Sequence, residues 1–102
     1  MSSIISLLKR IEENPLMYLG KKDLHSLRQF VSGYLTCEND NGRYESTMDF
    51  ESFKNYFNKV YGLRSFYGYD DVLLQETENP EEAFDKFFEL FNRFLVESEI
   101  NQ

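Results

Sequence analysis

Residues 79–97 read NPEEAFDKFFELFNRFLVE. Large apolar residues recur in this segment every three or four positions, which is the spacing of one helix face and not the alternation of a strand: Phe84, Phe87, Phe88, Phe91, Phe94 and Leu95. Asn79 is a candidate N-cap, Pro80 suits the first helical position, and Glu82 stands where a capping box places its carboxylate. Because burying each large side chain is worth about 1.5–3 kcal/mol, we expect the rest of the chain to pack around this helix.

Three weaker helical patterns and one ambiguous segment precede it. The patterns predict a helix from a cap at Ser3 to Asn14, a second from a cap at Asp23 to about residue 35, and a third from a cap at Thr47 or Asp49 to about Gly62. For residues 70–78, a short helix capped by Asp70 is preferred over a buried extended run at 72–74. The predicted fold is therefore all-α, a single compact domain over residues 1–102 with four to five helices packed around the Phe-rich C-terminal helix.

The predicted connections differ in character. Residues 16–20, after Pro15, are apolar and are expected to fold back onto the core. Gly33 lies inside a predicted helix, which suggests that another helix approaches closely there. Residues 37–46 form a polar loop with an Asn41-Gly42 turn signal, and residues 63–69 are expected to be irregular.

Charge is unevenly spread along the chain. The net charge is −7, yet residues 1–36 hold five basic and three acidic residues, against six basic and fifteen acidic in the remainder. An acidic remainder argues against direct nucleic-acid binding, which needs cations that face phosphates. It suits either solubility alone or a basic protein partner. The chain has no apolar run long enough to span a membrane and no signal-peptide pattern near Met1, so a cytoplasmic location is expected.

Residues with catalytic or metal-binding chemistry are scarce. His25 and Cys37 are each the only residue of their type, which excludes an internal disulfide and a Cys/His zinc site. The two lie about three turns apart on one predicted helix, too far for a nucleophile–base pair. Residues 38–45 have oxygen ligands but not the spacing of a calcium loop. The sequence predicts no catalytic residues, no cofactor and no metal, and an enzyme would have only carboxylates to work with.

The segment Asn14-Pro15-Leu16-Met17-Tyr18-Leu19-Gly20 is followed at set intervals by Leu24, Leu27, Phe30, Gly33 and Tyr34. This pattern resembles the opening of small bacterial immunity proteins from contact-dependent growth inhibition and related polymorphic toxin systems. Asp49-Phe50, Phe53, Tyr56-Phe57 and the segment from Glu82 to Leu90 are similar to that family's second half, so the resemblance covers nearly the whole chain. Leu16 stands where a glycine is common, and Tyr69 where a tryptophan is expected.

The resemblance implies an antitoxin that binds and neutralises one cognate secreted toxin domain, with a nuclease such as an RNase as the first expectation. Inhibitors of this kind are not enzymes. The acidic composition agrees with such a partner, because nuclease surfaces are commonly basic. The alternative is an acidic adaptor or regulatory module with a different protein partner. A monomer is favoured.

Aromatic and acidic residues come together near the middle of the acidic part of the chain. Tyrosine beside carboxylate makes a surface that buries area while it meets cations, although the preferred interpretation is that Phe66 and Tyr69 are core and the acids a solvated rim. We predict partner contacts in segments outside the apolar stripes, at Tyr67, Asp70, Asp71, Glu76 and Glu78, with a second contact at Glu38, Asp40 and Glu45. The rival surface is Glu81, Glu82, Asp85 and Glu89.

Overall fold

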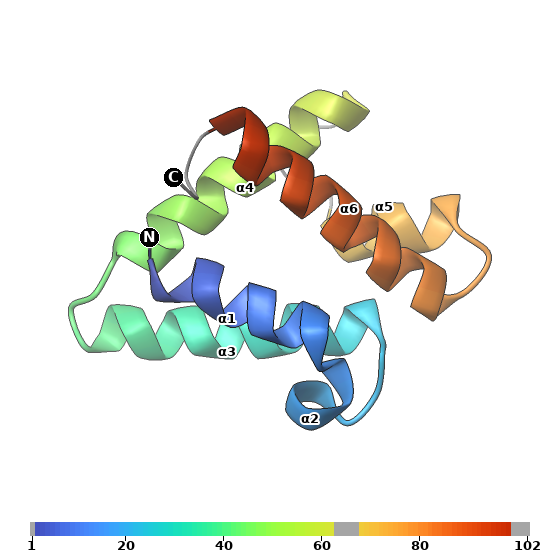
Figure 1. Ribbon diagram of the computed structural model, residues 1–102. Helices are drawn as coiled ribbons and strands as arrows, with labels where there is room; N and C mark the ends of the chain where they lie inside the picture. The colour runs from blue at the N-terminus through green and yellow to red at the C-terminus, as the bar shows by residue number, and fades with distance from the viewer. Residues whose placement is uncertain (1, 63–67, 99–102) are drawn as a thin grey trace.

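The computed structural model describes residues 2–62 and 68–98, and this part of the chain is all-helical, as predicted (Figure 1). Its six helices are α1 (Ser3–Glu13), α2 (Pro15–Leu19), α3 (Leu24–Asp40), α4 (Glu45–Tyr61), α5 (Tyr69–Glu76) and α6 (Pro80–Ser98). The ambiguous segment after residue 69 is helix, so that prediction is confirmed. The predicted four to five helices become six because residues 15–19 also form a helical turn.

α6 is the element on which the others pack. It contacts α3, α4 and α5 directly, and Asn92 on α6 bonds to Lys9 and Glu12 on α1. Every residue of the predicted apolar stripe is buried, together with Ala83 and Leu90. The prediction that the chain packs around this helix is confirmed.

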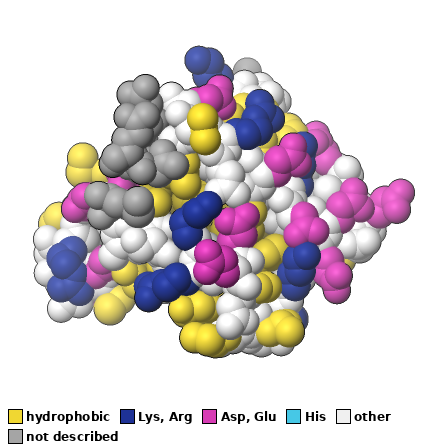
Figure 2. Space-filling view, viewed as in Figure 1, with side chains coloured by type: hydrophobic (Ala, Val, Ile, Leu, Met, Phe, Trp, Pro, Cys, Tyr) yellow, Lys and Arg dark blue, Asp and Glu magenta, His cyan; other side chains and the backbone are white. Residues whose placement is uncertain are grey.

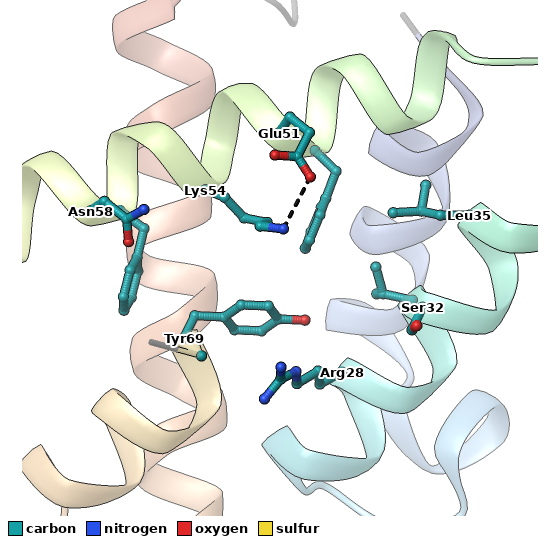
Figure 3. Close-up of a pocket in the computed structure, with 11 residues that line it drawn as sticks. Arg28, Ser32, Leu35, Glu51, Lys54, Asn58 and Tyr69 are labelled. Carbon is teal, nitrogen blue, oxygen red and sulfur yellow. Dashed lines mark hydrogen bonds and ion pairs between the residues drawn. The ribbon is translucent and has the colours of Figure 1, made fainter. Parts of the chain in front are cut away.

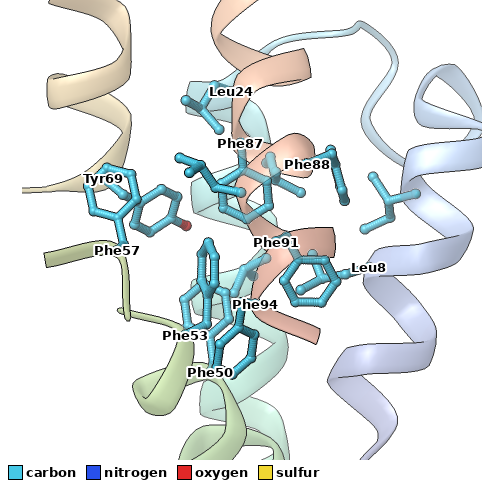
Figure 4. Close-up of a cluster of buried hydrophobic side chains, with 14 of the residues drawn as sticks. Leu8, Leu24, Phe50, Phe53, Phe57, Tyr69, Phe87, Phe88, Phe91 and Phe94 are labelled. Atoms are coloured by element: carbon cyan, nitrogen blue, oxygen red, sulfur yellow. The ribbon is translucent and has the colours of Figure 1, made fainter. Parts of the chain in front are cut away.

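Aromatic side chains from α4, α5 and α6 form the centre of the core (Figure 4). The ring of Phe53 on α4 lies edge-on to three rings of α6, with centroid distances of 5.3 Å to Phe87, 5.4 Å to Phe91 and 5.6 Å to Phe94. Tyr69 on α5 lies 5.4 Å from Phe87. Edge-to-face contacts of this kind add stabilisation beyond area burial.

Two predicted caps are present. At the start of α6, the Asn79 side-chain oxygen accepts from the Glu82 backbone N–H at 2.8 Å. The Glu82 carboxylate in turn accepts from the N–H of Glu78 at 3.3 Å, one residue before the position that a capping box predicts. At the start of α3, the Asp23 carboxylate accepts from the N–H of His25 at 3.3 Å.

Other predicted helix starts are wrong. The predicted cap side chains form hydrogen bonds with other parts of the chain instead of capping their own helices. α1 is preceded by Ser2, while the Ser3 hydroxyl donates to Glu38 at 2.6 Å and lies 2.9 Å from the Ser46 hydroxyl. α4 begins at Glu45, ahead of Thr47, whose hydroxyl donates across the turn to Asn39. α5 follows Gly68 rather than a cap at Asp70.

The connections are shorter or more exposed than predicted. α3 continues to Asp40, so the polar loop shrinks to a tight turn in which Gly42 adopts φ 75°. Gly33 has open space where a Cβ would stand, so the expected close helix approach is wrong. In α2 only Tyr18 and Leu19 pack on the core, since a single helical turn presents one side to it, and Leu16 and Met17 face outward. The irregular segment predicted at 63–69 falls mainly outside the described residues.

Candidate protein-interaction surface

The net charge of the chain is concentrated in α5 and the first half of α6. Residues 69–89, here called the acidic hairpin, contain eight carboxylates and one lysine, whereas the rest of the chain contains ten acidic and ten basic residues. The net charge of −7 therefore belongs to this one helical hairpin. Seven of its carboxylates are exposed: Asp71, Glu76, Glu78, Glu81, Glu82, Asp85 and Glu89. Figure 2 shows acidic side chains gathered on the right of the view, over α5 and α6.

Two exposed carboxylates of the acidic hairpin form ion pairs with lysines. Lys22, from the segment between α2 and α3, lies 2.7 Å from the Asp85 carboxylate. Lys86 lies 3.4 Å from Glu89, one helical turn along α6. Glu81 and Glu82 occupy the first turn of α6, where the helix dipole favours negative charge. The surface therefore keeps a strong negative potential while its helices stay stable.

Asp70 does not belong to this exposed surface, which corrects the sequence prediction. Its side chain is 0 % exposed, and its two oxygens lie 2.5 Å from the Arg28 guanidinium and 3.2 Å from His25 Nδ1. A Cβ on Gly68 would stand 2.5 Å from the Arg28 guanidinium and 2.8 Å from the Asp70 carboxylate, so any larger residue at position 68 would require these side chains to shift. Asp70 joins α5 to α3 and is unavailable to a partner.

Glu38 is also wrongly placed by the sequence prediction. Its carboxylate is buried among the Ser3 hydroxyl at 2.6 Å, the Arg43 guanidinium at 2.6 Å and the Tyr34 hydroxyl at 3.5 Å. Hydrogen bonding from Ser3 and then from Arg43 holds the pKa of Glu38 below its ordinary value. Glu38 ties α3 to α1 and to the turn before α4. Asp40 and Glu45, by contrast, are exposed as expected.

The two predicted contact regions lie at opposite ends of α3. His25, near the start of α3, touches Asp70 of the acidic hairpin, while Glu38 lies near the other end of the same helix. Thirteen residues of helix separate them, which is about 20 Å at the usual rise per residue. Figure 1 shows the α3–α4 turn and the α5–α6 hairpin on opposite sides of the molecule. Asp40 and Glu45 are therefore not part of the surface made by the acidic hairpin.

The structure places the exposed members of the predicted contact set and the rival acidic residues on one surface. Asp71, Glu76 and Glu78 belong to the same helical hairpin as the rival residues on α6, so one acidic surface replaces the two alternatives. Tyr67, predicted as a contact, lies outside the described residues. Tyr69 is core, and its burial, followed by the nearby Asp70 charge, raises the pKa of its hydroxyl. A charge count over a window of about twenty residues would have located the whole surface.

A hollow of about 250 Å³ lies next to the hairpin, between α3, α4 and α5 (Figure 3). Arg28 and Lys54 line it from α3 and α4, with Tyr69 on the α5 side. Each cation already has a carboxylate partner, because Arg28 pairs with Asp70 and Lys54 with Glu51 at 3.0 Å. The hollow therefore offers no net charge with which to select an ion.

Within residues 2–62 and 68–98, no three His, Cys, Asp or Glu side chains are grouped so as to hold a metal ion. None of the helices in the described part of the chain is both long enough and apolar enough to cross a membrane. Comparison of the chain with protein-family models, with curated proteins and with solved structures finds no match.

Proposed function

We propose that this chain is an immunity protein that binds a cognate toxin domain, most simply a basic nuclease, and neutralises it by covering its substrate-binding surface. The observation that carries the proposal is the gathering of seven exposed carboxylates, with one lysine among them, on the acidic hairpin. A charge needed only for solubility would have no reason to gather on one hairpin while the remainder is balanced.

The acidic hairpin has the chemistry that a nucleic-acid-binding surface recognises. A nuclease presents lysine and arginine side chains to a row of phosphates. Exposed carboxylates on two adjacent helices offer those cations a similar row of negative charges. Complementary charge of this kind accelerates encounter and disfavours wrong partners. An inhibitor of this design competes directly with the substrate.

The sequence resemblance to immunity proteins of contact-dependent inhibition supports the same proposal. Its most distinctive segment, Asn14 to Gly20, forms α2 and the turns on either side of it. The described part of the fold is built around rigid packed helices, which suits a protein that binds with little rearrangement.

Co-expression with the reading frame next to this chain's gene tests the proposal, because the proposal requires that frame to encode a toxin. We expect the chain to restore growth and to abolish the toxin's activity on its substrate when the purified proteins are mixed at equal concentrations. A variant with Asp71→Asn, Glu76→Gln and Glu78→Gln should protect less well. The matched control is Asp40→Asn with Glu45→Gln, which removes exposed charge at the far end of α3.

Three outcomes are informative. Rescue by the wild-type chain and by the control, but weaker rescue by the hairpin variant, supports the proposal. Failure of the wild-type chain to bind or protect overturns it. Binding without loss of toxin activity points instead to an adaptor with an acidic docking surface.

A further inference from the structure

α2 exposes two neighbouring large apolar side chains. Leu16 is 64 % exposed and Met17 69 %, and no residue of α2 is buried. The helix is held by Pro15 at its start and by Gly20 at its end, where the Gly20 N–H donates to the Leu16 carbonyl at 2.9 Å and φ is 76°. The structure thus keeps an apolar turn ordered on the surface. Figure 2 shows hydrophobic side chains at the bottom of the view, over α2, with acidic side chains above and to the right.

Beside α2 lies a cleft of about 410 Å³, here called the α2–α6 cleft. Its apolar lining comes from Pro15, Phe84 and Phe88, and its acidic lining from Glu12, Asp85 and Glu89. The acidic residues of the cleft come from both α1 and α6, and those of α6 belong to the acidic hairpin. The cleft therefore lies between the start of α2, at Pro15, and the negatively charged surface of α6.

Each acidic residue of the cleft already has a lysine partner within the chain: Glu12 pairs with Lys9, Asp85 with Lys22 and Glu89 with Lys86. Of these lysines, Lys22 also meets an aromatic ring of the cleft. The Lys22 ammonium lies 5.9 Å from the centre of the Phe84 ring and 2.7 Å from the Asp85 carboxylate. An aromatic face and a carboxylate are the two groups that together favour a cationic side chain. Lys22 and Asp85 are both accessible to solvent, with side-chain exposures of 36 % and 64 %. Phe84 is buried, so a cation from outside would reach its ring by taking the place of Lys22.

We infer that the α2–α6 cleft, with Leu16 and Met17, forms the anchoring part of the interface: it receives an arginine or lysine side chain of the basic toxin domain while a neighbouring apolar side chain of that domain covers α2. The inference rests on the proposed function and adds to it the location and chemistry of the anchor. Charge complementarity selects this occupant, since a second copy of the chain would bring another acidic hairpin to the same place. Apolar anchors surrounded by charged rims are the usual source of binding free energy in such interfaces.

The apolar half of the inference is tested by Leu16→Ala with Met17→Ala. The control is Met48→Ala with Val96→Ala, because Met48 is 67 % and Val96 70 % exposed but they stand on α4 and near the end of α6, not on α2. Binding to the purified toxin domain is measured by titration calorimetry. We expect the dissociation constant of the α2 variant to be at least about tenfold higher than that of wild type, because an interface anchor is lost. The control should stay within about twofold of wild type, because it alters residues outside the interface.

The cationic half is tested by a variant that should gain affinity. Lys22→Gln removes the internal cation from the Phe84 face and leaves Asp85 free for the partner. Lys54→Gln is the matched control, because it removes a comparable surface pair with Glu51 outside the cleft. We expect Lys22→Gln to bind several-fold more tightly and Lys54→Gln to change little, with unfolding temperatures unaltered in both. A role for Lys22 confined to stability would not increase affinity.

The results separate the inference from the proposed function. Equal affinity of wild type and the α2 variant, or no gain for Lys22→Gln, overturns the anchor while the immunity function stands. Failure of the wild-type chain to bind the toxin domain overturns both. A dimer of the free chain in sedimentation, lost in the Leu16→Ala, Met17→Ala variant, would assign the cleft to a second copy and also overturn the inference.

Discussion

Asp70 shows how one side chain decides the position of a whole helix. Its carboxylate is completely buried, and its partners Arg28 and His25 lie on α3, more than forty residues away along the chain. Arg28 and His25 are both partly exposed, so the contact lies at the edge of the core and only Asp70 is buried. Buried carboxylates persist where their oxygens are hydrogen-bonded, and this one satisfies both oxygens on a neighbouring helix.

Replacement of Asp70 should therefore destabilise the fold, whereas replacement of its neighbour should not. We expect Asp70→Asn to lower the free energy of unfolding by about 1–3 kcal/mol, because charge-assisted hydrogen bonds are lost while the shape is kept. The exposed Asp71→Asn, in the same helical turn, should cost less than about 1 kcal/mol. Urea denaturation of the two variants provides the comparison, and equal losses would contradict the buried role of Asp70.

Glu38 makes the stability of the protein sensitive to acid. Its pKa is held below the ordinary value by the Ser3 hydroxyl and the Arg43 guanidinium, so the folded state binds this proton less readily than the unfolded state. The contribution is present above the ordinary pKa of 4.5 and is lost as pH falls through the lowered value. We expect the unfolding-temperature advantage of wild type over Glu38→Gln to be largest above about pH 5 and to shrink at lower pH. A gap that is constant with pH would contradict this assignment.

At the scale of elements, α4 and α6 are joined mainly by aromatic rings. Phe53 is in ring contact with three residues of α6 and two of its own helix, and its side chain is fully buried. Polar contacts between these helices lie at the edge, where the Tyr56 hydroxyl donates to Glu97. The geometry of the pair therefore depends on ring packing.

Truncation of Phe53 should remove the centre of that packing. We expect Phe53→Ala to cost about 3–5 kcal/mol, from lost transfer free energy and the cavity left behind. That is a large share of the total stability of a domain of this size. Val96→Ala on α6 is the control, since an exposed truncation changes stability by about 0.5 kcal/mol or less. Thermal unfolding followed by circular dichroism gives both values, and a loss below about 1 kcal/mol for Phe53→Ala would contradict this packing.

At the scale of the whole molecule, α3 separates two ends of different character. The acidic hairpin touches the start of α3, and the turn held by Glu38 and Arg43 lies at its other end. Because exposed charges are screened beyond about 10 Å at 0.1 M salt, these ends act independently on an approaching partner. Only the hairpin end has the net charge to steer it.

The association rate with the toxin domain should therefore depend on salt through the hairpin. We expect the rate constant to fall steeply between low salt and 0.15 M for wild type, and less steeply for Asp71→Asn, Glu76→Gln, Glu78→Gln. The Asp40→Asn, Glu45→Gln variant should keep the wild-type slope. Stopped-flow mixing at several salt concentrations measures the slopes. If Asp40→Asn, Glu45→Gln reduces the salt dependence as much as the hairpin variant does, the assignment of steering to the acidic hairpin is contradicted.

The acidic surface was partly visible in the sequence. Asp71, Glu76 and Glu78 are exposed as predicted, because no apolar spacing surrounds them. Asp70 is one residue from Asp71 and chemically identical to it, yet it is buried. The two differ only in which side of the first turn of α5 they occupy, and that side becomes the inside only when α3 is packed there.

The sequence by itself determined the long helices α1, α3, α4 and α6, the apolar stripe along α6 and the caps at Asp23 and Asn79, because each depends on residues within about four positions. The tertiary structure alone decided which carboxylates are buried and that Leu16 and Met17 face outward. These outcomes depend on partners such as Arg28 and Asp70, 42 residues apart, or Ser3 and Glu38, 35 apart. Contacts at that range form only when whole helices pack, so no local pattern encodes them.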